Sequence, residues 1–511
     1  MSSGFDSWAL TLVTFLPLAG ALVVMLIPRS WGEESHKTTA LAAALATMGV
    51  MIYVLNSYSP KSGAKLQFEV DKPWIDVINS RYHIGIEGLG LPLLTLSCVI
   101  VILCMVYSWD HFPEPHNPKA FLALILVLQT GMNGTFISQD LILFFVFFEL
   151  VLLPMYFMIG VWGGPNRQYA SIKFFLFTMF GSAFMLLSFL ALYFKAGNTF
   201  DIAQLSTNIA SGNFPISHGT QVLIFGGLFL GFAIKVPMFP FHTWLPDAHT
   251  EAPTVGSVIL AAILLKLGTY GFVKIALPIL PRAAVSWAPW IGLLAVIGII
   301  YGALGCLAQK DMKRLIAFSS VAHMGYVMLG ISTLTSAGIN AAMFGMVAHG
   351  LITGMLFFVA GSTKDRYHTL EIAKLGGMLK SMPHMGWILG FASMASLGLP
   401  GLAGFWGEFP SILSAYEPAK GLSVPTFRAY MVVAAVGTVL AAGYLLWLYQ
   451  RAAFGEPKGE FEHEHFHDVH VPEWIAWTPL LIGIVALGVF PKILFQISDP
   501  AVHALTKAFG G

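Results

Sequence analysis

Long apolar segments recur along nearly the whole of this 511-residue chain, and they decide what it can fold into. Each is about 20 residues long, the length that an α-helix needs to cross the hydrocarbon core of a bilayer. Only 10% of the residues are charged, whereas a soluble domain averages about 25%. Barrel strands would need shorter segments of alternating polarity, which the sequence lacks. The sequence therefore predicts an all-α polytopic membrane protein.

Fourteen segments meet this criterion, so both chain termini are expected on the same side of the membrane. The segments lie near residues 8–27, 38–57, 90–108, 118–137, 139–161, 168–195, 221–250, 253–278, 284–307, 314–332, 336–360, 383–416, 427–450 and 475–494. The loops after odd-numbered segments carry a small excess of Lys and Arg, which favour the inner side of a membrane. This excess predicts termini on the outer, periplasmic side of a bacterial inner membrane and the loop with Lys310 and Arg314 inside.

Four ionisable residues, Glu149, Lys235, Lys266 and Glu408, lie within these apolar segments. A lone charge at that depth costs at least about 2.5–3.5 kcal/mol, so such residues are usually retained for a function such as proton transfer. For Glu149, a structural ion pair with a basic residue of a neighbouring helix is the alternative, and it does not exclude proton movement. Burial disfavours the charged forms of Lys266 and Glu408, which favours proton exchange near neutral pH. Separating an ion pair of Glu149 and Lys235 would release the lysine proton.

Two of the segments, 221–250 and 383–416, are too long for one straight helix. Each holds a charge, Lys235 or Glu408, with a proline two residues later. Proline removes a backbone donor and clashes with the carbonyl four residues before it, so both helices are expected to be interrupted at these prolines. Interrupted helices at membrane depth occur where protein or a wet cavity satisfies the freed backbone groups.

The spacing of the ionisable residues indicates an inverted repeat. Glu408 follows Lys235 by 173 residues, and His323 follows Glu149 by 174. This shift corresponds to five helices, an odd number, so the second copy must be upside down, as is typical of transporters. The expected organisation is an N-terminal three-helix segment with an outer loop, a first repeat, a second repeat, and a His-rich loop with a terminal helix, at residues 1–117, 118–278, 279–450 and 451–511.

The remaining polar positions give weaker signals. His323 and His349 can bridge Lys266 and Glu408 as proton carriers, or be hydrogen-bonded core histidines. We interpret the segment from His242 to Pro253 as an access loop or gate rather than a metal site. The stretch 460–470 is interpreted as a solvated His-rich loop, because its spacing does not match a structural zinc site. The three cysteines show no metal or disulfide spacing. No cofactor-binding or metal-binding residue is predicted.

Several strings of this sequence resemble one family, the antiporter-like subunits of respiratory complex I. They are residues 235–253, Phe148-Glu149-Leu150, residues 404–409 and residues 313–326. The resemblance extends over the predicted helices four to thirteen. Within the family, chain M of NADH-quinone oxidoreductase is the most similar, because chains L and N typically carry lysine at the position of Glu408. Chain L also continues into a long lateral helix, which has no counterpart here.

The resemblance implies a proton-translocating membrane subunit of NADH:quinone oxidoreductase with no redox centre of its own. FMN, iron–sulfur clusters and quinone are expected in partner subunits. Other membrane subunits, above all neighbouring antiporter-like chains, are the expected protein partners, together with lipids and protons but not nucleic acid. The implied proton relay comprises Glu149 and Lys235 as a first ion pair, Lys266 as the central lysine, His323 and His349 as the connection, and Glu408 as the terminal acid.

Three alternatives stay open at this point. A subunit of a multisubunit Na⁺/proton antiporter or of a membrane-bound hydrogenase would share the fold. A stand-alone solute transporter would need a pocket near the membrane midplane. A quinone-binding redox subunit would need a quinone pocket or redox ligands, and the sequence shows no signal for either.

Overall fold

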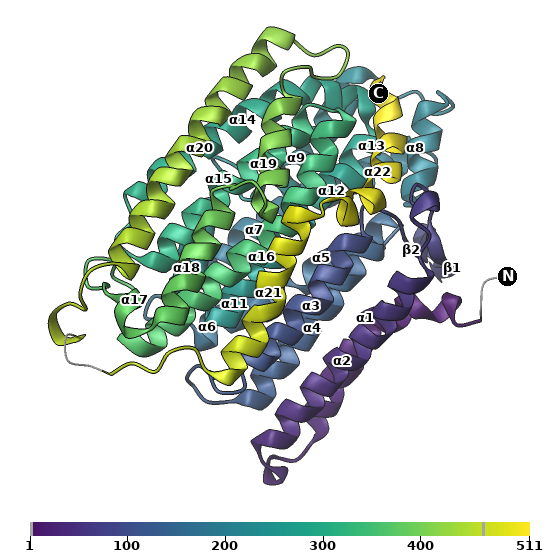
Figure 1. The fold of residues 1–511 in the computed structure, drawn as a ribbon. Coiled ribbons are helices and arrows are strands. Elements are labelled where there is room, and N and C mark those ends of the chain that lie inside the picture. The colour runs from purple at the N-terminus through teal and green to yellow at the C-terminus, as the bar shows by residue number, and fades with distance from the viewer. Residues whose placement is uncertain (1–3, 462–464, 511) are drawn as a thin grey trace.

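A computed structural model describes residues 4–461 and 465–510 of the chain. Its helices run side by side as one bundle (Figure 1). Twelve helices of the described part are long and apolar enough to cross a membrane, which confirms the predicted all-α membrane fold. They are α1 (Asp6–Leu26), α2 (Glu33–Ser57), α4 (Pro118–Ile137), α5 and α6 (Leu141–Leu150 and Leu152–Trp162, one continuous span), α7 (Arg167–Lys195), α9 (His218–Lys235), the continuous helix Thr254–Ile279, α14 (Pro281–Leu307), α15 (Met312–Ser332), α16 (Ser336–Tyr367), α20 (Val424–Ala453) and α21 (Val471–Val489).

Two predicted segments form shorter helices. The third is α3 (Leu91–Tyr107), which has 17 residues. The segment 383–416 divides into α18 (Pro383–Ser396) and α19 (Ala403–Ser414). The count of fourteen spans, the inverted repeat and the four-part division of the chain therefore stay predictions.

The two interruptions have different causes. Helix α9 ends at Lys235, and α10 (Trp244–Glu251) follows a break that contains Pro237. The indole nitrogen of Trp244 donates a 2.9 Å hydrogen bond to the carbonyl of Ile234, which satisfies one backbone group freed by the break.

The second interruption lies earlier in the chain than expected. Helix α19 continues through Pro410, so the expected break at this proline is wrong. The chain is interrupted instead at residues 397–402, where Gly398 and Gly401 have φ of +81° and +92°. Glycine reaches this left-handed region without steric cost, and such residues end helices, whereas a proline can merely kink one.

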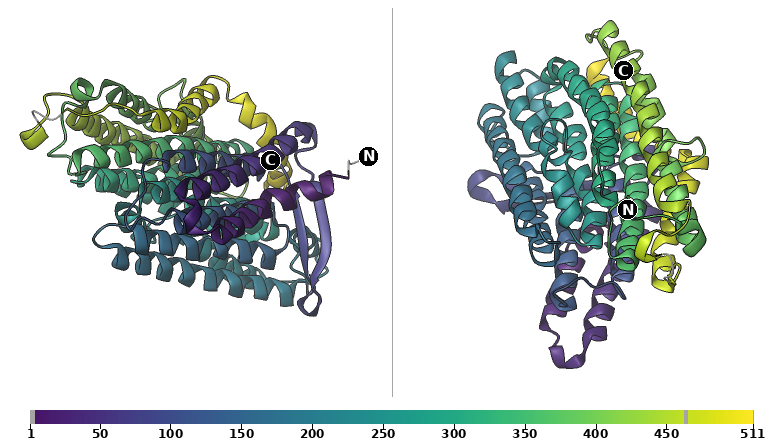
Figure 2. Two further views of the ribbon diagram at one scale, coloured as in Figure 1. Left: turned by 90° about the horizontal axis from the view of Figure 1, so that it is seen from below. Right: turned by 90° about the vertical axis from the view of Figure 1, so that its left-hand side faces the viewer.

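Smaller elements cover the two ends of the bundle. Strands β1 (Gln67–Ile75) and β2 (Ser80–Ile86) form an antiparallel hairpin that lies across one end, as the left view of Figure 2 shows. Helices α8 (Ile202–Ala210) and α22 (Lys492–Thr506) lie at this hairpin end. The opposite end, which we call the Lys310 end, carries α17 (Met378–Ser381) and the loop between α14 and α15.

The described part of the His-rich stretch links helices at the Lys310 end. Arg366 in α16 donates hydrogen bonds of 2.8 Å to the carbonyls of His467 and Asp468. Two of its guanidinium nitrogens also donate hydrogen bonds of 2.9 and 2.8 Å to the two carboxylate oxygens of Glu473 in α21. Asp468 accepts hydrogen bonds from the backbone N–H groups of His384 and Met385 and so caps α18.

In the part of the chain that the structure describes, no group of three His, Cys, Asp or Glu side chains is placed to hold a metal ion. Glu462, His463 and Glu464 lie outside the described residues.

His83 of the hairpin forms a hydrogen bond with Asp201, which lies at the start of α8 in the helical bundle. In β2, His83 Nδ1 lies 2.6 Å from a carboxylate oxygen of Asp201, and Nε2 lies 2.9 Å from Glu69. Burial disfavours the imidazolium, but the hydrogen bonds to Asp201 and Glu69 outweigh burial and raise the pKa of His83. Burial alone would raise the pKa of Asp201, but the hydrogen bond from His83 lowers it below its usual value.

Replacing Arg366 with methionine is expected to leave the fully buried Glu473 without its guanidinium partner, with only the imidazole of His111 at 3.7 Å. Breaking a buried ion pair on one side costs about 3–5 kcal/mol, whereas replacing both partners with apolar residues is often neutral. We expect the thermal unfolding midpoint of the purified protein to fall in Arg366→Met and to recover in the double variant Arg366→Met/Glu473→Leu. A double variant as unstable as the single one would contradict the assignment.

The pKa directions predict a pH window for the hairpin. The stabilisation from His83 is fully present below its unfolded pKa of about 6.5 and is lost as pH rises through its raised folded pKa. The stabilisation from Asp201 is present above its unfolded pKa of about 3.9 and is lost as pH falls through its lowered folded pKa. Hydrogen-exchange protection of the hairpin amides should therefore be greatest between about pH 4 and pH 6.5. The decline above that range should be absent in His83→Gln.

Candidate functional site

Six ionisable residues predicted from the sequence lie on six different helices of the bundle. The structure brings four of them into one continuous series and leaves the other two as a separate pair. The pair is Glu149 in α5 and Lys235 at the end of α9. The series comprises Lys266 in α12 (Leu265–Gly271), His349 in α16, His323 in α15 and Glu408 in α19.

Glu149 and Lys235 attract each other without direct contact. The Glu149 carboxylate accepts a hydrogen bond from Ser182 of α7. Among the described residues, the Lys235 ammonium has no hydrogen-bond partner and no carboxylate within 4.0 Å. It lies 4.9 Å from the ring centre of Phe148 and 5.9 Å from that of Phe174. The expected direct ion pair is therefore replaced by cation–π contacts and a longer-range attraction to Glu149.

Lys266 lies in a deeply buried helix of the site. This helix runs from Thr254 to Ile279 and is wholly buried over its membrane-spanning window. It contains two π-helical stretches, η4 (Leu260–Leu264) and η5 (Phe272–Ala276), of a kind that often marks functional sites. The Lys266 ammonium donates hydrogen bonds to the Ala261 carbonyl and, at 2.7 Å, to His349 Nδ1.

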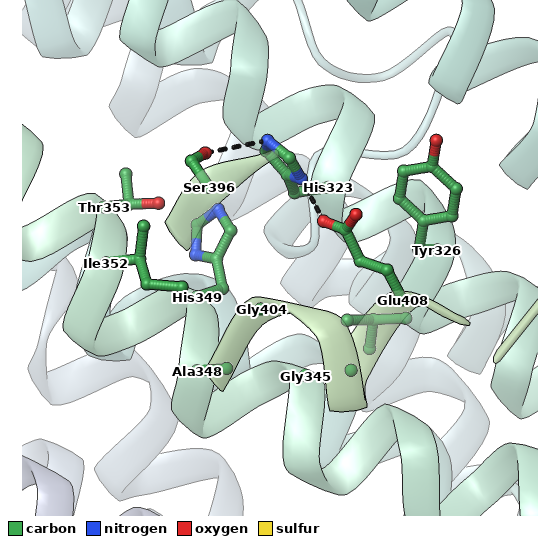
Figure 3. Close-up of a pocket in the computed structure, with 12 residues that line it drawn as sticks. His323, Tyr326, Gly345, Ala348, His349, Ile352, Thr353, Ser396, Gly404 and Glu408 are labelled. Carbon is green, nitrogen blue, oxygen red and sulfur yellow. Dashed lines mark hydrogen bonds and ion pairs between the residues drawn. The ribbon is translucent and has the colours of Figure 1, made fainter. Parts of the chain in front are cut away.

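His323 connects this lysine–histidine contact to Glu408. The rings of His349 and His323 lie 6.1 Å apart between centres. His323 Nδ1 is hydrogen-bonded to the Glu408 carboxylate, and its Nε2 lies 3.1 Å from the hydroxyl oxygens of both Ser396 and Tyr444. Figure 3 shows the His323 ring between Ser396 and Glu408, with His349 beside them.

A small cavity of about 20 Å³ lies between these groups and is lined by both histidines and Glu408. A volume of about 10–15 Å³ suffices for one water molecule. Two glycines permit the helices to approach here, because a Cβ atom on Gly407 of α19 would lie 2.5 Å from the Gly345 Cα of α16.

The arrangement is suited to moving a proton. An imidazole accepts a proton at one ring nitrogen and releases it from the other. His349 Nδ1 faces Lys266, whereas its Nε2 has no hydrogen-bond partner among the described residues. The series thus runs from the amine of Lys266 through the two imidazoles to the carboxylate of Glu408.

No sequence pattern indicated the hydroxyl groups of this site. Ser182, Ser396 and Tyr444 are single polar residues within apolar helices, and their roles follow from the neighbours that the fold supplies. The segment from His242 to Pro253 lies at the Lys310 end, where Asp247 forms ion pairs of 2.7 Å with Lys173 and 3.0 Å with Arg314.

Comparison with known proteins identifies the family. The family described as NADH:quinone oxidoreductase/Mrp antiporter, TM, matches residues 138–435, and NADH-ubiquinone oxidoreductase chain 4, amino terminus, matches residues 19–135. The NADH-quinone oxidoreductase subunit M of Rickettsia bellii is 40% identical over 504 residues, 98% of this chain and 99% of that protein. The subunit M of Rhodobacter capsulatus is 39% identical over 98% of this chain and 96% of its own length.

Solved structures have the same fold. A chain of respiratory complex I from Thermus thermophilus with bound NADH superposes with a TM-score of 0.86 and 27% identity, covering 98% of this chain and all of that one. A chain of the Mrp complex from Dietzia superposes with a TM-score of 0.83 at 20% identity, covering 98% of this chain and 52% of that one, a likeness of fold alone. The full-length relatives at about 40% identity and the two family matches together show that this chain belongs to the NADH-quinone oxidoreductase subunit M family.

Proposed function

We propose that this chain is a proton-translocating membrane subunit of NADH:quinone oxidoreductase and that its buried charged residues carry the protons. The observation that carries the proposal is the series of Lys266, His349, His323 and Glu408 across four helices. Acids and bases at membrane depth are costly, and such chains are typical of proton relays.

A proton on the Lys266 ammonium can pass along its 2.7 Å contact to His349 Nδ1, leaving a neutral amine. His349 then releases a proton from Nε2 towards His323 across the small cavity. His323 passes a proton from Nδ1 to the Glu408 carboxylate, with which it shares a hydrogen bond. Each transfer moves one proton, and a further cycle requires that Lys266 is reprotonated, that Glu408 releases its proton and that both imidazoles return to their starting tautomers.

Glu149 and Lys235 are suited to control this series rather than to extend it. Attraction to the Glu149 carboxylate favours the charged form of Lys235, and helix α9 packs against α12, which carries Lys266. A rearrangement that separated the two charges would disfavour the Lys235 ammonium and change the field at Lys266. This is a coupled titration, in which neither residue acts alone.

The redox chemistry belongs, in this proposal, to partner subunits that hold FMN, iron–sulfur clusters and quinone. Neighbouring antiporter-like chains are the lateral partners, and membrane lipids surround the bundle. The protein lies in a bacterial inner membrane with the Lys310 end inside and the termini outside. A cation/proton antiporter subunit is less well supported, because the full-length relatives at about 40% identity are oxidoreductase subunits and the Mrp chain shares only 20% identity.

Replacing Lys235 or Glu149 with alanine in the assembled complex is expected to reduce proton pumping and coupled quinone reduction together. The loss should be about tenfold or more if proton transfer becomes limiting. Electron transfer from NADH to an artificial acceptor should persist, since it does not require the membrane path. Lys195→Ala, at the exposed end of α7, is a matched control and should behave as wild type. Wild-type pumping in both site variants would exclude a role of this pair in controlling proton transfer.

Glu408→Gln tests the other end of the series. Glutamine preserves the shape of the side chain and can hydrogen-bond to His323, but it cannot accept a proton from it. Pumping in membrane vesicles is expected to fall, again by about tenfold, while the amount of assembled complex is unchanged. The control is Glu417→Gln, an exposed glutamate beyond the end of α19. Equal pumping in the two variants would contradict a role for Glu408.

A further inference from the structure

An open groove runs along the surface of the bundle between α7, α9 and α14. Its volume is about 730 Å³, within the range of about 300–1,000 Å³ that is typical of small-molecule sites. Its walls are formed by α7 between Phe184 and Ala191, by α9 between Gly219 and Leu230, and by Trp287 of α14. Along α9 the groove extends over about 16 Å, at a rise of 1.5 Å per residue. This length is close to half of the hydrocarbon core, about 15 Å, so the groove spans one leaflet of the bilayer.

The walls of the groove offer only apolar atoms to an occupant. The hydroxyl of Ser188 donates a 2.9 Å hydrogen bond to a backbone carbonyl of α9, and the indole nitrogen of Trp287 donates one of 3.0 Å to another. The other lining side chains are apolar, and Leu187 and Leu223 are 61% and 77% exposed. A polar or charged ligand would therefore find no partner inside the groove, whereas a hydrocarbon chain would.

The hairpin end of the groove carries positive charge without a counter-charge. Helices α7, α9 and α14 contain no Asp or Glu. Arg282, in the first turn of α14, is exposed and forms no ion pair with any described residue. One turn further along, Ser286 Oγ lies 3.1 Å from Nε2 of His218, the neighbour of Gly219 at the mouth of the groove. Residues four apart share one face of a helix, so Arg282 lies on the face that carries this contact.

We propose that the groove binds one anionic phospholipid, with an acyl chain along α9 and the phosphate at Arg282 and His218. A guanidinium forms strong, often bidentate hydrogen bonds with phosphate, and basic residues near a membrane surface attract anionic lipids. Trp287 lies one to two turns below Arg282, as is typical of tryptophan at the boundary between headgroups and hydrocarbon.

Charge and shape together favour a lipid over the other occupants. Free phosphate would pair with Arg282 but leave the apolar groove empty. An apolar helix of a neighbouring subunit would fill the groove but leave Arg282 without a counter-charge. A phospholipid with a net negative charge matches both parts of the site. This proposal does not depend on the proton relay.

The choice of lipid can be measured on the purified full-length chain in detergent. A ligand that binds the folded state raises the thermal unfolding midpoint in proportion to its occupancy. The probes are phosphatidylglycerol, phosphatidylcholine with the same acyl chains, and glycerol 3-phosphate, which has the anion but no chain. Phosphatidylglycerol is expected to give the largest increase and glycerol 3-phosphate none. Equal increases with the two lipids, or an equal increase with glycerol 3-phosphate, would overturn the proposal.

Two variants separate the headgroup from the chain. Arg282→Gln is expected to lower the affinity for phosphatidylglycerol about fivefold and to leave that for phosphatidylcholine unchanged. Gly219→Leu should weaken both lipids, because a Cβ atom at Gly219 meets no atom within 4 Å and the leucine can extend into the groove without a clash. Lys65→Gln is the matched control, since Lys65 is exposed in the loop before β1 and does not line the groove. Wild-type affinity for phosphatidylglycerol in either groove variant would contradict the assignment.

The occupant in the assembled complex can be identified by photo-cross-linking. Leu223 lines the groove and its side chain is largely exposed. With a benzophenone amino acid in place of Leu223, illumination of the complex in its native membrane is expected to attach a phospholipid, detected by mass spectrometry as a mass increase of this chain alone. A cross-link to another subunit would show that a protein covers the groove, and the lipid site would then be wrong.

Discussion

The cost of burying charge in an apolar helical bundle is the constraint on which the rest of this structure depends. The contacts that offset this cost differ from one buried charge to the next. Lys266 has two acceptors, a backbone carbonyl and His349. The Glu408 carboxylate is hydrogen-bonded to His323, and the Glu149 carboxylate accepts a hydrogen bond from the hydroxyl of Ser182. The Lys235 ammonium lies over the ring of Phe148 and is attracted by the Glu149 carboxylate, which is not in direct contact with it. Hydrogen-bond partners lower the free-energy cost of burying a charged group. A buried group with few such partners is destabilised in its charged form and changes protonation state more readily.

Helix interruptions and glycines place these groups within reach of one another. The break after Lys235 ends α9 at the charged residue and turns α10 towards the Lys310 end, where Asp247 joins α7 to α15. The break before α19 depends on the two left-handed glycines between α18 and α19. The contact of Gly407 with Gly345 then holds α19 against α16, so that Glu408 and His349 border one cavity.

The outer parts of the chain are held by conventional polar contacts. The hairpin depends on His83 between two carboxylates, and the described part of the His-rich stretch depends on Arg366 and Asp468. These side chains have hydrogen-bond partners, whereas the Lys235 ammonium in the bundle has none among the described residues.

The class of fold and the identity of the buried charges could be predicted from the sequence alone. Hydropathy reports the free energy of burial residue by residue, so apolar segments and the charges within them, such as Lys266 and Glu408, are visible without a structure. It misplaced the second helix break at Pro410, because backbone conformation there depends on two glycines rather than on the proline. Only the tertiary structure showed that Glu149 and Lys235 are apart and that Ser396 and Tyr444 lie within hydrogen-bond distance of His323. Contacts between helices distant in sequence depend on how those helices pack, and no local pattern encodes that packing.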